Sequence, residues 1–127
     1  MSLAYWCILI AGILPPATVA IAKFGAADFD NAEPRGWLDR QQGFRRRADA
    51  AHRNHFEAFP FFTAGVLVAQ LCQVPQTQVD LLAASFIALR IAYTVLYLAN
   101  LATLRSLVWT LAYLCVIALF VLSGLQS

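Results

Sequence analysis

The sequence predicts an all-α integral membrane protein: a single domain, residues 1–127, whose helices cross the bilayer as a four-helix bundle. Hydrophobic residues make up 61% of the chain and charged residues 13%, and the charged share is about half the usual one. A water-soluble domain of this length would be unable to hide so much apolar surface, so lipid is the expected solvent. The net charge of +2 is too small to indicate a nucleic-acid partner.

The first predicted helix covers Leu3–Ala22 and is long enough to span a hydrocarbon core of ~30 Å. Pro15 and Pro16 remove two backbone donors inside it and predict a kink. A segment from Lys23 to Arg45 follows, which is too polar to cross a membrane. It contains four turn formers, which are Gly25, Pro34, Gly36 and Gly43.

The second predicted helix covers residues 45–74. Its first part is polar on one side, whereas residues 58–72 are almost wholly apolar. Pro60 lies inside it, which membrane helices tolerate because neighbouring groups satisfy the freed carbonyl. The third and fourth helices are predicted over residues 79–101 and 104–125. Their short link makes them antiparallel neighbours.

The basic residues predict the topology. All but one of them lie in or beside the first and third links, namely Lys23, Arg35, Arg40, Arg45, Arg46, Arg47, Arg53 and Arg105. Both links lie on the same side of a chain with four membrane-spanning helices. The termini and the second link carry no Lys or Arg. The positive-inside rule therefore predicts cytoplasmic basic loops and both termini outside.

Glu57 and Arg90 are charges inside predicted membrane helices. Such charges are costly and usually face the bundle interior or a polar cavity. Each lies about eleven residues from the predicted cytoplasmic boundary, which is a depth of roughly 16 Å. Matching depth allows a direct ion pair. Two interpretations stay open, since the pair either fixes helix register only or also holds a ligand.

Polar side chains form two stripes at helical spacing. The second helix presents Arg47, Asn54, Glu57 and Phe61, and the third helix presents Arg90, Tyr93, Tyr97 and Asn100. These cations, amides, phenols and one carboxylate suit a zwitterionic small molecule that bears carboxylates. Arginines would bind its carboxylates and Glu57 its ammonium group. Alternatively, Tyr93 and Tyr97 are interfacial anchors.

Other polar residues surround these stripes. Arg105 is a candidate activator of a thiol, because a neighbouring arginine favours the thiolate; alternatively, it is a charge that sets topology. His52 and His55 are expected to form structural hydrogen bonds. Asp49 and Arg53, four residues apart, predict a local surface pair. The chain shows no set of metal ligands.

Two patterns resemble those of the MAPEG family, the membrane-associated proteins of eicosanoid and glutathione metabolism. The run from Arg47 to Phe62, with Asn54-x-x-Glu57-x-x-Pro60 at its centre, resembles the family's second-helix signature. The pattern Arg90-x-x-Tyr93-x-x-x-Tyr97, followed by Arg105, resembles its third-helix pattern. Length and the four predicted helices agree along nearly the whole chain.

The resemblance implies a homotrimer with a glutathione site between neighbouring subunits, open to the cytoplasmic side. It implies the activity of a membrane glutathione transferase or peroxidase, with glutathione as co-substrate. Arg105 would be catalytic, as the activator of the thiol. The glutathione-binding residues would be Arg47, Asn54, Glu57, Arg90, Tyr93 and Tyr97. A lipophilic second substrate would arrive from the membrane lipids.

One position departs from the family pattern. Many of the family's transferases carry an arginine four residues before the motif asparagine, where this chain has Ala50. A contact with a glutathione carboxylate is therefore missing unless Arg46, Arg47 or Arg53 replaces it. This departure favours an alternative, a non-catalytic lipid-binding or scaffold protein of the same fold. A small proton-coupled exporter using Glu57 is a further alternative, although its usual first-helix carboxylate is absent.

Overall fold

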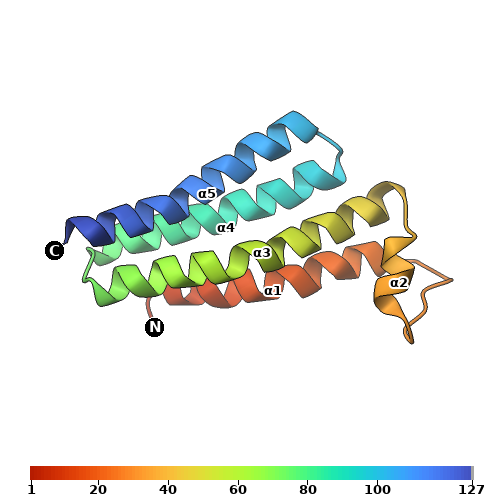
Figure 1. Cartoon of the computed structure of the whole chain (residues 1–127), viewed down its shortest axis with the longest axis horizontal. Coiled ribbons are helices and arrows are strands. Elements are labelled where there is room, and N and C mark those ends of the chain that lie inside the picture. Colours follow the sequence, from red (N-terminus) through yellow and green to blue (C-terminus); the bar gives the residue numbers. More distant parts are fainter. Residues whose placement is uncertain (127) are drawn as a thin grey trace.

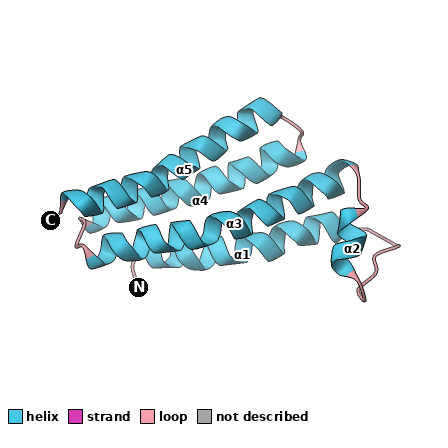
Figure 2. Ribbon diagram, in the orientation of Figure 1, coloured by secondary structure: helices cyan, strands magenta, loops and turns pink. Residues whose placement is uncertain are grey.

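A computed structural model describes residues 1–126, and these residues are helical with short links (Figures 1 and 2). The helices are α1 (Leu3–Lys23), α2 (Pro34–Asp39), α3 (Gly43–Leu71), α4 (Gln76–Leu98) and α5 (Ala102–Leu125). The four long helices run side by side along the long axis of the molecule, and α2 lies across one end (Figure 1). The all-α prediction is confirmed for these residues.

The long helices pack as two pairs, which are joined through α3 and through a contact between α1 and α4. α1 packs mainly on α3 and α4 on α5, while α3 also contacts both α4 and α5. Phe62 and Val66 of α3 are fully buried between these helices, together with Leu119 of α5. The Phe62 ring stacks on Phe86 of α4, with their centroids 4.0 Å apart. This apolar core fixes how α3 is rotated relative to its neighbours.

Three of the described helices, α1, α4 and α5, are long and apolar enough to cross a membrane. Between 22% and 28% of each apolar segment is buried inside the chain, so most of this surface is available to lipid or to another subunit. α3 has 29 residues, or roughly 44 Å at ~1.5 Å per residue. Its polar first half sets it apart from the three apolar helices, and its membrane crossing stays a prediction.

The two ends of the bundle differ in charge. Both termini and the α3–α4 link lie at one end, which we call the terminal end (Figure 1). The α1–α3 connection, with α2, and the α4–α5 link lie at the other, which we call the basic end. The two links that carry basic residues thus share one end, as predicted. The side of the membrane that this end faces stays a prediction.

The polar segment after α1 differs from the prediction because it contains a helix, α2. Pro34 stands in its first turn, where a proline costs no hydrogen bond. Trp37 and Leu38 are buried against Ala22 of α1 and Ala48 of α3. A helix of 6 residues is too short to produce a periodic apolar pattern. The glycines and the proline in and around it therefore led to the prediction of turns.

Candidate functional site

Arg90 of α4 is a buried cation, 2% exposed. Its Nε and one terminal guanidinium nitrogen lie 3.3 and 2.9 Å from Nδ1 of His55 on α3. The guanidinium carbon lies 4.5 Å from the ring centroid of Tyr93, one helical turn further along α4. Arg90 is therefore held by an imidazole at its edge and by a phenol ring at its face.

The His55 ring is part of a chain of hydrogen bonds that returns to Arg90. His55 Nε2 lies 2.7 Å from the Thr94 hydroxyl oxygen, and that hydroxyl donates to the Arg90 carbonyl oxygen at 3.0 Å. Because Nδ1 faces guanidinium donors and the Thr94 proton is already used, we assign the ring proton to Nε2. His55 is then neutral. Its predicted structural hydrogen bonding is confirmed.

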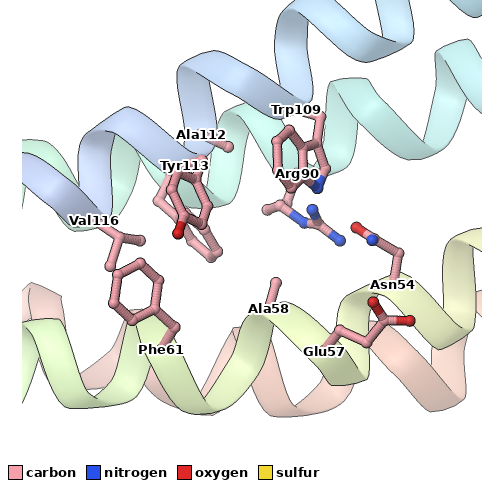
Figure 3. A pocket seen from close by; sticks show the side chains of 10 residues that line it. Asn54, Glu57, Ala58, Phe61, Arg90, Trp109, Ala112, Tyr113 and Val116 are labelled. Carbon is pink, nitrogen blue, oxygen red and sulfur yellow. The ribbon is translucent and has the colours of Figure 1, made fainter.

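A cavity of about 200 Å³ lies between α3, α4 and α5, and Arg90 reaches into it (Figure 3). Asn54 and Glu57 project from α3 toward the Arg90 guanidinium across this cavity. The predicted direct ion pair between Glu57 and Arg90 is not formed within 4.0 Å. Glu57 is exposed, and within residues 1–126 it has no ion-pair partner. The Asn54 side-chain oxygen is buried, with no hydrogen-bond partner among the same residues.

The other end of the same cavity is apolar. Phe61 of α3 faces Tyr113 and Val116 of α5 (Figure 3). The ring centroids of Phe61 and Tyr113 lie 5.3 Å apart. Phe86 and Ala112 complete this wall. The cavity therefore offers a carboxylate, an amide and a cation at one end and aromatic surface at the other.

A second cavity, of about 420 Å³, adjoins the first and shares Asn54 and Trp109 with it. Its wall also contains Tyr93 and Tyr97 of α4 and Arg105 of α5. The Arg105 guanidinium carbon lies 4.2 Å from the Tyr97 ring centroid. Six predicted site residues thus line two adjoining cavities, namely Asn54, Glu57, Arg90, Tyr93, Tyr97 and Arg105.

Arg47 and Ala50 lie apart from these cavities. Arg47 donates from Nε and one terminal nitrogen to the carbonyl oxygen of Leu98, at 3.3 and 3.2 Å, and so caps the C-terminus of α4. Ala50 lines a separate surface cavity with α2. Beside it, Arg53 Nε lies 3.0 Å from Asp49 Oδ2, which confirms the predicted local pair; its placement on the surface holds for Arg53 only, because Asp49 is buried.

Trp109 and Tyr113 are wall residues that the sequence interpretation missed. They follow Arg105 at intervals of four residues, a spacing that places all three on one face of a helix. The Trp109 and Tyr113 rings stack with centroids 5.3 Å apart. The sequence signal for this wall is the pair of aromatic residues on the same helix face as Arg105, the candidate catalytic arginine.

Comparison with known proteins gives one match. No curated protein and no solved structure matches the chain, whereas the model of the MAPEG family matches residues 3–125, nearly the whole chain. Together with three helices apolar enough to cross a membrane, this match identifies an integral membrane protein. The chain belongs to the MAPEG family, the membrane proteins of eicosanoid and glutathione metabolism.

Proposed function

We propose that this protein is a homotrimeric membrane glutathione transferase or peroxidase that acts on lipophilic electrophiles. The observation that carries the proposal is the pair of adjoining cavities, which place Arg90, Glu57 and Asn54 next to both Arg105 and an aromatic wall. A zwitterionic tripeptide needs a cation, an anion and amide groups. A lipophilic electrophile needs apolar surface beside the thiol.

Each polar residue has a role in this proposal. Arg90 binds a glutathione carboxylate, Glu57 accepts hydrogen bonds from the ammonium group, and Asn54 bonds the peptide backbone. Tyr93 and Tyr97 close the wall between Arg90 and Arg105. Arg105 stabilises the thiolate. Arg47, carried over from the family pattern, lines neither cavity and would reach the ligand only with the guanidinium N–H groups that do not bind the Leu98 carbonyl.

In the transferase reaction, the thiolate sulfur attacks an electrophilic carbon. A C–S bond forms, the leaving group departs with its bonding electrons, and the thiol proton goes to water. In the peroxidase reaction, two glutathione molecules supply two electrons to the O–O bond. The products are an alcohol, water and glutathione disulfide. In both reactions the protein contributes orientation and electrostatic stabilisation.

The surface of the single chain supports assembly and membrane placement. Glu57 is exposed beside its cavity, although a carboxylate at this depth is expected to face a polar surface. A neighbouring subunit of a trimer would cover this opening and complete the site. We place the basic end in the cytoplasm, from which glutathione enters, and the lipophilic substrate enters from the bilayer.

Conjugation of chlorodinitrobenzene to glutathione by the purified protein tests the proposal. Arg105→Ala should lower kcat by about 100-fold or more, as expected when a preorganised charge next to the reacting atom is lost. Arg35→Ala, an exposed arginine of α2, is the matched control and should conjugate at the wild-type rate. An unchanged rate in Arg105→Ala would remove this residue from the mechanism.

Ala50 supports a second candidate, a lipid-binding or scaffold protein of the same fold. It stands where many of the family's transferases carry an arginine, and it lines neither of the two cavities. Calorimetry with glutathione separates the candidates. Binding heat accompanied by conjugation supports the transferase, whereas the absence of both supports the scaffold.

A further inference from the structure

The partner of Arg90 is neutral, which is unusual for a buried arginine. Burial removes the hydration of a guanidinium, so a buried arginine is normally paired with a carboxylate. Here the donors of Arg90 meet the Nδ1 nitrogen of His55, which accepts hydrogen bonds without bringing a negative charge. The ion pairs within residues 1–126 involve Asp39 and Asp49, and Arg90 takes part in none of them.

The hydrogen bonds to His55 also determine where the guanidinium points. They use Nε and one terminal nitrogen, and the Tyr93 ring covers one face. The remaining N–H groups lie on the cavity side, toward Asn54 and Glu57 (Figure 3). Since a guanidinium is planar and rigid, fixing one edge fixes the other.

His55 is itself rigidly placed. It is 2% exposed, its Nε2 bonds to the Thr94 hydroxyl, and its ring meets Tyr93 edge-on at 6.0 Å. The Thr94 hydroxyl is anchored in turn to the Arg90 carbonyl. The imidazole therefore acts as a fixed spacer between α3 and the Arg90 side chain.

We infer that His55 is a positioning residue, which aims Arg90 into the cavity while leaving its positive charge for a carboxylate of the ligand. The inference rests on the proposed function and deepens it, because it assigns the carboxylate-binding charge of the site to Arg90. Glu57, which lines the same cavity and has no ion-pair partner among residues 1–126, is left for a cationic group. A zwitterionic ligand complements both.

Two isosteric variants test the inference. In His55→Asn, an amide oxygen replaces Nδ1 as a neutral acceptor. In His55→Asp, a group of the same shape adds a negative charge that pairs with Arg90. Calorimetry measures binding of S-methylglutathione, which has no free thiol, to the full chain in lipid nanodiscs. Thermal unfolding of the same samples measures stability.

We expect His55→Asn to bind within about threefold of wild type and His55→Asp about tenfold or more weaker; a factor of ten corresponds to about 1.4 kcal/mol. The unfolding temperature of His55→Asp should equal or exceed that of His55→Asn, because its ion pair stabilises the fold. A purely structural His55 would give the opposite result, with equal affinities in the two folded variants. That result would overturn the inference.

A further variant covers the case in which His55→Asp does not fold. Thr94→Val releases Nε2 of His55 without adding charge, and it should raise KM for glutathione by about threefold with kcat unchanged. An unchanged KM would overturn the inference. Wild-type protein that binds S-methylglutathione without conjugating electrophiles would disprove the transferase and retain this inference, whereas wild-type protein that does not bind it overturns both.

Discussion

α3 meets α5 differently in its two halves. Toward the terminal end, α3 approaches α5 closely at Gly65, where an added Cβ would lie 3.2 Å from Val116 Cγ1 and 3.4 Å from a Phe120 ring carbon. Toward the basic end, Asn54 of α3 and Trp109 of α5 stand on the walls of both cavities. α5 also rises away from α3 in the same direction (Figure 1).

Side-chain size and polarity explain this difference. The close half has glycine at the contact and apolar side chains around it, so the two helices meet without polar groups to satisfy. The open half has an arginine, an amide and a carboxylate, whose polar groups need space and partners. The close half therefore supplies the packing energy, and the open half supplies the candidate ligand site.

The largest expected effect comes from removing the cation of the open half. Arg90→Leu should weaken glutathione binding by about 100-fold or more, since the loss of one partner of a buried charge pair costs roughly 2–5 kcal/mol. Arg90→Lys keeps the charge but loses the planar fork, and it should give an intermediate affinity. Calorimetry measures both. Wild-type affinity in Arg90→Leu would place the ligand elsewhere.

The close half should respond through stability. Gly65→Val inserts methyl groups between α3 and α5 and should lower the free energy of unfolding by about 1–3 kcal/mol, the usual cost of overpacking. Gly12→Ala is the matched control, because its Cβ would meet only the Phe59 ring, at 3.4 Å. Denaturant titration in detergent measures both variants. Equal stability of the two variants would show that α3 and α5 can move apart at Gly65 with little loss of stability.

Arg47 lies at the basic end, yet its substitution should affect stability more than ligand binding. Because Arg47 donates to the Leu98 carbonyl, Arg47→Ala should cost about 1.5–3 kcal/mol of stability, as expected for a hydrogen bond from a charged donor. The accompanying loss of glutathione affinity should be smaller than in Arg90→Leu. Equal losses in the two variants would give Arg47 a direct share in binding.

The sequence was sufficient for features that depend on local patterns. Apolar runs predicted the four long helices, and helical spacing predicted the Asp49–Arg53 pair. Spacing and depth together also placed Asn54, Glu57 and Arg90 around one volume. Each of these features follows from periodicity along a helix.

The partner of Arg90 could not be predicted from depth in the membrane. Depth gives the position of a residue along a helix axis, but not its rotation about that axis. Glu57 and His55 lie two residues apart, at nearly the same depth but on different faces of α3. The buried face of α3 includes Ala51, His55, Phe62 and Val66. A histidine in register with core residues was a signal that it faces another helix, and the core packing turns this face toward Arg90.

The smallest expected effect concerns the ion pair that joins α2 to α3 outside the site. The Arg53 side chain is 52% exposed and pairs with Asp39 of α2 as well as with Asp49. Exposed pairs contribute about 0–1 kcal/mol, and the buried Asp49 carboxylate keeps its contact with His52, so Arg53→Ala should change stability by only about 1 kcal/mol and should leave glutathione affinity unchanged. Trp37→Ala should cost more, because burial of Trp37 and Leu38 against Ala22 and Ala48 holds α2 in place. Denaturant titration at low and high salt distinguishes the two, and a larger loss in Arg53→Ala than in Trp37→Ala would mean that charge, rather than apolar contact, docks α2 onto the bundle.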